Sequence, residues 1–190
     1  MEYLNPDTAA FLVPAIEELA DLLDMEEYSS EGSRFHALRL PKISLSEYID
    51  RMIRYCPASE ATYTVMYIYL DRIANSSDEA FINKHTLHRL VLAAFVVASK
   101  YCDDVFETNS YYARVGGISV AEINNLEIEF LSRLHFDLFV PLNEYGVAED
   151  CIYRPLAAKS AEERAKAHAP TTVRYHLMQQ CMTQTVVQCQ

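Results

Sequence analysis

The sequence predicts an all-α protein, and three observations carry that prediction. Only four of the 190 residues are glycine. Apolar residues recur at spacings of three and four, which follow the helical period, rather than at spacings of two. The segment 83–101, NKHTLHRLVLAAFVVASKY, is apolar on nearly every side of a helix and therefore belongs inside a bundle. Its apolar run between Arg89 and Lys100 is too short for a membrane span, which takes about 20 residues.

Three helices are expected before this central one. The first is amphipathic, lies within residues 8–25 and is expected to begin near Pro14, because proline suits the first turn of a helix. The second begins after a capping box formed by Ser44 and Glu47, and Pro57 ends it. Ser59 caps the third, which frays out at residues 75–78. The apolar face of this third helix consists of Ala61, Val65, Ile68, Tyr69 and Ile73. For the central helix itself, Asn83 is the expected N-cap.

Two more helices are expected after the central one. Residues 103–109 form a loop and residues 110–115 a short helix, which ends in Gly116 and Gly117 because glycine adopts the left-handed conformation of a helix C-terminus. Ser119 and Glu122 form a second capping box, which opens a longer helix with Ile123, Leu126, Phe130, Leu131 and Leu134 facing inward. Beyond Pro141 the periodic signal weakens, and only residues 158–167 have a helix-forming composition.

The net charge of −11 is unevenly distributed. Residues 1–33 contain nine acidic residues and no Lys or Arg, whereas the rest of the chain is nearly neutral. This distribution argues against a nucleic-acid partner, which is usually met by clustered basic residues. We interpret the acidic arm as a packing and solubilising helix; the alternative is a regulatory docking element. Residues 28–33 are expected to be a linker.

The five cysteines form no CxxC pair, and the N-terminal residues do not have the pattern of a secretory signal. We therefore expect reduced thiols and a location in the cytoplasm, the nucleus or both. No membrane partner is expected.

The sequence contains no motif for a cofactor or a metal ion. The glycine patterns of nucleotide-binding loops are absent. His85 and His88 lie three residues apart but lack a third ligand. Asp103, Asp104 and Glu107 lack the alternation and the glycine of a calcium loop, so a solvated loop is the preferred interpretation. We expect no cofactor, no metal and no catalytic residue, and a small helical enzyme finds no support in the sequence.

Lys100 and Glu127 are the two charges beside core-facing positions. Lys100 lies at the end of the central helix, and Glu127 lies between Leu126 and Phe130 on the last predicted helix. A buried charge without a partner is costly, so each would need water or a partner if it were buried. Spacing alone favours an exposed Lys and an exposed Glu at helix edges.

Five segments, taken in order, resemble the cyclin box. They are PKISLSEYIDRMIRY from Pro41, YIYLDRI from Tyr67, HRLVLAAFVVASKYCDD from His88, YYARVGG from Tyr111 and INNLEIEFLSRLHFDL from Ile123. The set is most similar to the P-type or U-type branch, related to the fungal phosphate-pathway cyclin. The resemblance implies a cyclin fold, in which five helices surround a buried central helix, with N- and C-terminal helical extensions.

This resemblance gives the chain its expected organisation. Residues 41–141 would form the cyclin box, residues 1–40 an acidic extension with one amphipathic helix, and residues 142–190 a partly helical C-terminal extension. About fifty residues follow the box, too few for a second five-helix repeat, so a single-box cyclin is expected.

The resemblance also implies roles for particular residues. A Lys at the end of the third cyclin-box helix and a Glu on the fifth contribute to the kinase-binding surface of the family, and Lys100 and Glu127 match them. Kinase-binding positions are also implied for Tyr111, Tyr112, Val115, Gly116 and Gly117, and internal support for Asp71 and Arg72.

One departure bears on substrate docking. Cell-cycle cyclins carry an apolar patch with a Trp on the first box helix, whereas this chain has no Trp and places Ser44, Ser46 and Tyr48 there. Docking of that kind is not expected.

The function implied by the resemblance is that of a regulatory subunit. Such a protein binds and activates a cyclin-dependent protein kinase without chemistry of its own, in cell-cycle control or in phosphate and nutrient signalling. The alternative is a cyclin-fold scaffold or adaptor that does not activate a kinase.

Overall fold

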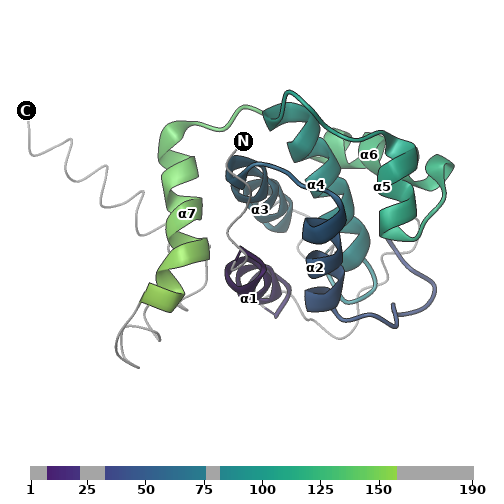
Figure 1. Cartoon of the computed structure of the whole chain (residues 1–190), viewed down its shortest axis with the longest axis horizontal. Coiled ribbons are helices and arrows are strands. Elements are labelled where there is room, and N and C mark those ends of the chain that lie inside the picture. The colour runs from purple at the N-terminus through teal and green to yellow at the C-terminus, as the bar shows by residue number, and fades with distance from the viewer. Residues whose placement is uncertain (1–7, 22–32, 76–81, 158–190) are drawn as a thin grey trace, which may run out of the picture.

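The computed structural model describes residues 8–21, 33–75 and 82–157. These residues form helices and no strands, which confirms the all-α prediction for the described part of the chain. The helices are α1 (Thr8–Asp21), α2 (Leu45–Tyr55), α3 (Glu60–Ala74), α4 (Leu87–Cys102), α5 (Asn109–Gly116), α6 (Val120–Arg133) and α7 (Leu142–Ala157). Figure 1 shows α4 with α3 to its left and with α5 and α6 to its right.

Helix α4 is the buried centre of the fold, as predicted. Every residue from Leu90 to Ser99 is buried, so the helix meets neighbours on all sides. Helices α3, α5 and α6 pack against it. Lys100, one residue further on, is the first position of this helix where the surface is reached again.

Helix α3 is more deeply buried than its sequence pattern suggested. All residues from Thr62 to Leu70 are buried, whereas we expected a single apolar face. The reason is that α4 packs on one side of α3 while α1 and α7 pack on it as well. Thr62, Thr64 and the tyrosines carry polar groups, so a hydrophobicity pattern does not predict that this second face is buried.

The capping signals were largely correct. Ser44 and Glu47 form the complete capping box at α2, and the Ser59 side chain accepts from the backbone N–H of Thr62 at α3. At α6 only half of the expected box forms: the Ser119 hydroxyl accepts from Glu122 N–H, but the Glu122 carboxylate binds Arg89 on α4 at 2.6 Å. A tertiary ion pair has therefore replaced the local hydrogen bond.

The start of α4 differs from its prediction. The helix begins at Leu87, and Asn83 instead organises the preceding turn by accepting from the backbone N–H of His85. The carbonyl of Asn83 accepts from Thr86 and Leu87, so the turn leads directly into the helix.

Two helices outside the expected box complete the core. Helix α1 begins at Thr8 rather than near Pro14, because Leu12 and Val13 are buried and Pro14 lies on the exposed face. Burying such a side chain contributes about 1.5–3 kcal/mol, which offsets the cost of a proline within a helix. Helix α7 lies in the extension that was expected to be partly helical, but at residues for which no helix was predicted, and it packs against α1 and α3 with Ala148, Cys151 and Ile152 buried. The expected helix at 158–167 and most of the linker at 28–33 lie outside the described residues.

Candidate functional site

Lys100 and Glu127 are brought together as an ion pair. Lys100 lies in the last turn of α4 and Glu127 in the middle of α6, and the Lys100 Nζ to Glu127 Oε1 distance is 2.5 Å. Their side chains are 29% and 16% exposed. Spacing alone favoured two separate exposed charges, so the pairing is a correction: the requirement of each partly buried charge for a partner is met by the other.

The ammonium group of Lys100 has N–H donors that no other described residue uses. Glu127 is its single acceptor among the described residues, although an ammonium group has three N–H donors. Its place in the last turn of α4 is favourable, because cations are stabilised at a helix C-terminus. The pair therefore presents unused donors at the protein surface.

Asn109, which the sequence analysis did not single out, contacts the other oxygen of Glu127. Its Nδ2 donates to Glu127 Oε2 at 2.8 Å and to Asn124 Oδ1 at 2.7 Å. Asn109 is the first residue of α5, and Asn124 lies one turn before Glu127 on α6. No local pattern could have revealed this contact, because Asn109 and Glu127 lie 18 residues apart on different helices.

The end of α4 is fixed by polar contacts behind this pair. Asp103, the C-cap, accepts from the Thr62 hydroxyl at 2.8 Å and from the Ser59 backbone N–H at 3.4 Å. The Tyr112 hydroxyl meets the Ser99 hydroxyl at 3.0 Å and accepts from Glu107 N–H at 3.0 Å. The loop from α4 to α5 is thus held at both of its ends.

The residues of the YYARVGG segment do not all face outward. Tyr112 and Val115 are buried, and the ring of Tyr112 packs edge-on against Phe95. Their side chains therefore face the core, and the expectation that both belong to a kinase-binding surface stays a prediction. The reason is that α5 is a short helix with one face on α4, and these two residues lie on that face.

Tyr111 lies closer to the surface than Tyr112. It is half-buried, donates its hydroxyl to the Tyr55 carbonyl at 2.7 Å and lies under the Arg114 guanidinium at 5.0 Å. It therefore faces α2 rather than the Lys100 and Glu127 pair.

Glycine is required at Gly116 and at Gly117 for two different physical reasons. A Cβ on Gly116 would lie 2.4 Å from Leu92 Cδ2, so the absence of a side chain lets α5 approach α4 closely. Gly117 is the C-cap of α5 with φ of 72°, in the left-handed region that glycine adopts without strain.

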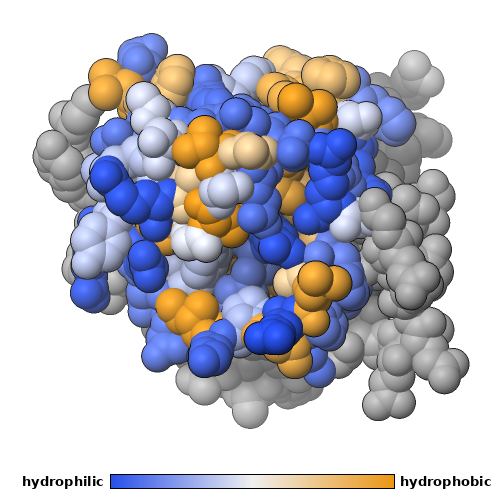
Figure 2. Space-filling model, turned by 90° about the vertical axis from the view of Figure 1, so that its right-hand side faces the viewer, coloured by the Kyte–Doolittle hydropathy of each residue, from blue (hydrophilic) through white to orange (hydrophobic). Residues whose placement is uncertain are grey.

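Four exposed apolar residues lie close to Lys100 or Glu127 in the sequence. Tyr101 follows Lys100, Ile128 follows Glu127, and Val105 and Phe106 lie in the loop between α4 and α5; all four are exposed. Figure 2 looks at the side of the molecule that carries α5 and α6 and shows hydrophobic side chains as separate islands among hydrophilic ones. A surface of this mixed kind is ordinary for a protein and does not by itself mark an interface.

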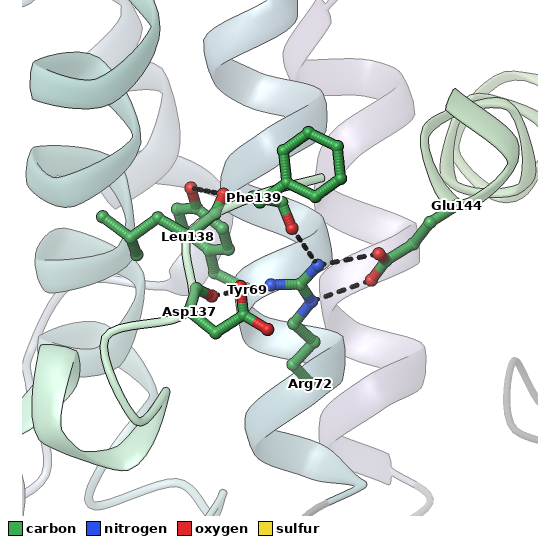
Figure 3. Close-up of polar contacts among 6 residues, drawn as sticks. All are labelled: Tyr69, Arg72, Asp137, Leu138, Phe139 and Glu144. Carbon is green, nitrogen blue, oxygen red and sulfur yellow. Dashed lines mark hydrogen bonds and ion pairs between the residues drawn. The ribbon is translucent and has the colours of Figure 1, made fainter. Parts of the chain in front are cut away.

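Arg72 forms a second polar cluster, shown in Figure 3. Its guanidinium makes a two-pronged contact with Glu144 of α7, with distances of 2.8 and 2.7 Å, and donates to the carbonyls of Asp137 and Phe139. The Tyr69 hydroxyl donates to the Leu138 carbonyl at 2.9 Å. This cluster joins α3 to the segment after α6 and to the first turn of α7.

Asp71 lies beside this cluster without an ion-pair partner. Its Oδ1 atom is buried and has no hydrogen-bond partner among the described residues. Burial raises the pKa of Asp71 to about 6; the amide of Asn75 and the guanidinium of Arg72 oppose the increase, and the Glu144 carboxylate adds to it. The positive charge of Arg72 is directed to Glu144 instead.

The thiols of Cys56 and Cys102 are not activated as nucleophiles. Burial raises the pKa of the Cys56 thiol to about 12 and that of Cys102 to about 11, so both thiols stay protonated and are poor nucleophiles. No group of three His, Cys, Asp or Glu side chains gathers as a metal site would within residues 8–21, 33–75 and 82–157. In the same part of the chain, no helix is long and apolar enough to cross a bilayer.

Comparison with known proteins gives one consistent match. A family model described as Cyclin matches residues 9–138. The chain is 38% identical over 141 residues to Cyclin-U4-1 of Arabidopsis thaliana, which covers 72% of this chain and 70% of that protein. It is 37% identical over 147 residues to the PHO85 cyclin-like protein psl1 of Schizosaccharomyces pombe, covering 72% of this chain and 60% of that protein.

A rice protein extends the set. Cyclin-P3-1 of Oryza sativa subsp. japonica is 36% identical over 138 residues, which cover 73% of this chain and 58% of that protein. The chain therefore spans between 58% and 70% of the length of these three relatives. The matched residues 9–138 include α1 and end before α7 begins at Leu142.

Proposed function

Because the chain belongs to the cyclin family, we propose that it is a regulatory subunit that binds and activates a cyclin-dependent protein kinase and performs no chemistry itself. The pathway would be cell-cycle control or phosphate and nutrient signalling. The name of one relative, a PHO85 cyclin-like protein, supports the regulatory role.

Activation would be a shift in the conformational population of the kinase. A protein kinase is active only when a Lys on one of its strands pairs with a Glu on its mobile helix. A partner that binds only this arrangement stabilises it, and a change from 1:99 to 99:1 takes about 5.5 kcal/mol of differential affinity. An interface of roughly 1,600 Å² is enough for binding of that strength.

The observation that carries the proposal is the Lys100 and Glu127 pair with its unused donors. The two side chains are only 29% and 16% exposed, so the cost of desolvating both charges offsets most of their attraction, and the intact pair adds little to stability. Covered by a partner, the same charges become desolvated and each requires a matching group. Tyr101 and Ile128, which are exposed and follow the two charged residues in sequence, would supply apolar contact area.

Co-purification from the native cell extract tests the proposal. The wild-type chain and Glu127→Lys are used as baits, and the captured proteins are identified by mass spectrometry and assayed for kinase activity. We expect a cyclin-dependent kinase with the wild type and none with Glu127→Lys, because a reversed charge in a desolvated contact costs on the order of 3–5 kcal/mol.

Circular dichroism controls for folding, and Asn125→Ala serves as a matched surface control because Asn125 is exposed on the same helix. Tight kinase binding by a well-folded Glu127→Lys protein would contradict the proposed surface. Absence of any kinase with the wild type would favour the scaffold or adaptor without a kinase.

A further inference from the structure

Asn109 is placed to control the orientation of Glu127. The Glu127 carboxylate has two oxygens with separate partners: Oε1 binds Lys100, and Oε2 accepts from Asn109 Nδ2. Asn109 is in turn bound to Asn124, which lies on the same helix as Glu127. The Asn109 amide therefore connects α5 to two positions of α6, one turn apart.

The two contacts of the carboxylate differ in how easily they can change. Lys100 has a long side chain of which 29% is exposed, and its ammonium has a single acceptor among the described residues. Asn109 has a short side chain, and its Nδ2 donates to two acceptors. The Lys100 contact can be exchanged for a partner's group, whereas the Asn109 contact is fixed by the packing of α5 on α6.

The remaining atom of the Asn109 side chain shows that this arrangement carries a cost. Its Oδ1 is buried and has no hydrogen-bond partner among the described residues. An unsatisfied buried acceptor is unfavourable for folding. An asparagine at this position thus gains its hydrogen bonds to Glu127 and Asn124 at the expense of its own carbonyl, which is the pattern expected of a side chain that serves a site rather than the core.

We propose that Asn109 is a positioning residue of the kinase-binding surface. Its hydrogen bond to Oε2 fixes the position of the Glu127 carboxylate. Oε1 and the Lys100 ammonium can then exchange their mutual contact for contacts with the partner. The inference rests on the proposed function for the identity of the partner, but the hydrogen bond between Asn109 and Glu127 is a property of the free protein.

The first experiment uses the full chain without a partner. The side-chain NH₂ signals of Asn109 are identified in a ¹H–¹⁵N correlation spectrum by their loss in Asn109→Ala and are then followed in Glu127→Ala. We expect the Asn109 signals to move and those of the exposed Asn125 to stay. Unchanged Asn109 signals would overturn the inference, whether or not any kinase binds.

The second experiment is a double-mutant cycle on affinity for the co-purified kinase. A hydrogen bond to a charged group is worth enough that Asn109→Ala alone should weaken binding about tenfold or more. In the Glu127→Ala background the same change should alter affinity by no more than about twofold, because there is no carboxylate left to position.

Each result of the cycle has a defined meaning. An equal loss in both backgrounds would show that Asn109 acts elsewhere and would overturn the inference, as would an Asn109→Ala protein that is folded and binds like the wild type. Asn125→Ala is the matched control and should bind unchanged. If the wild type binds no kinase, the proposed function fails, and the spectrum of the free protein still decides whether Asn109 positions Glu127.

Discussion

The clusters around Arg72 and around Lys100 are both built on an ion pair between two helices, but they differ in how completely the cation is satisfied. Arg72 donates to both carboxylate oxygens of Glu144 and to two backbone carbonyls. Lys100 donates to Glu127 alone among the described residues. The exposure of the two pairs is similar, with side chains 22% and 13% exposed in the first and 29% and 16% in the second.

This difference is the reason why we propose a structural role for the Arg72 and Glu144 pair and a binding role for the Lys100 and Glu127 pair. All the acceptors of Arg72 belong to the segment that follows α6 and to α7, so the cluster fixes the C-terminal part of the core and leaves little to offer a partner. Lys100 keeps donors available, and its carboxylate partner is held from behind by Asn109. Buried area and ion-pair distance alone would not have distinguished the two.

Exchanging the charges of the second pair gives the largest expected effect. The double variant Lys100→Glu with Glu127→Lys retains an internal ion pair, but it loses the Asn109 hydrogen bond to Glu127 and places a carboxylate at the C-terminus of α4, so its unfolding free energy should fall by about 1–3 kcal/mol. Its kinase affinity should fall by roughly a hundredfold or more, because both charges now oppose the groups of the partner. Urea unfolding and titration calorimetry measure the two quantities. Wild-type affinity would mean that the pair is only structural.

Changing the Arg72 and Glu144 pair should lower stability and leave kinase affinity nearly unchanged. Arg72→Met removes the donors for two carbonyls and leaves the partly buried Glu144 without its partner, so we expect a loss of about 2–4 kcal/mol in unfolding free energy. Glu144→Gln, which keeps an acceptor for Arg72, is the control and should lose less. At a temperature where Arg72→Met is folded, kinase affinity should be nearly unchanged. A loss below about 0.5 kcal/mol would show that the cluster is not structural.

The pH dependence of stability at Asp71 shows whether Arg72 pairs with Glu144 and leaves Asp71 unpaired. Its pKa is raised from 3.8 to about 6 in the folded state, so the folded protein binds this proton more tightly than the unfolded chain does. Its contribution to stability is therefore present below about pH 4 and is lost as the pH rises through 6. The wild type should lose about 2 kcal/mol of unfolding free energy between pH 4 and pH 7.5 that Asp71→Asn does not lose. The stability difference between the two proteins should therefore change by about that amount in favour of Asp71→Asn.

The measurement for Asp71 is urea unfolding of both proteins at several pH values. A constant difference between them would mean that the Asp71 carboxyl is exposed to solvent or is paired with Arg72.

The smallest expected effects concern two glycines. Gly117→Ala places a side chain at φ of 72° and should cost about 1 kcal/mol, although there is open space around the position. Gly146→Ala in α7 is the matched comparison: nothing lies within 4 Å of its Cβ position, and it should stabilise the helix by about 0.5–1 kcal/mol. Thermal unfolding measures both. Equal effects would remove the conformational reason given for Gly117.

Local signals account for the parts of the fold that the sequence predicted well. The capping box at Ser44, the cap at Ser59, the left-handed Gly117 and the buried α4 all depend on residues within about four positions of one another. The second face of α3 and the whole of α7 depend on contacts between distant segments, and polar or small residues on these faces hide the helical period. Pro14 was misleading because a proline on an exposed face is tolerated when its neighbours are buried.

The same distinction applies to the candidate site. Lys100 and Glu127 could be selected from the sequence, because each lies beside core positions and matches a family motif. Their pairing, the contact from Asn109 and the burial of Tyr112 are tertiary properties, which arise from the packing of α4, α5 and α6. Residue type and spacing do not indicate which oxygen of the Glu127 carboxylate contacts Asn109 and which contacts Lys100.

Activation is the central claim, and its most direct measurement is the activity of the co-purified kinase, titrated with the purified chain. The account predicts a saturable rise in phosphorylation with the wild type, a comparable rise with folded Arg72→Met and none with Glu127→Lys. A kinase that binds the wild-type chain without any change in its activity would contradict the account and would make the protein a scaffold.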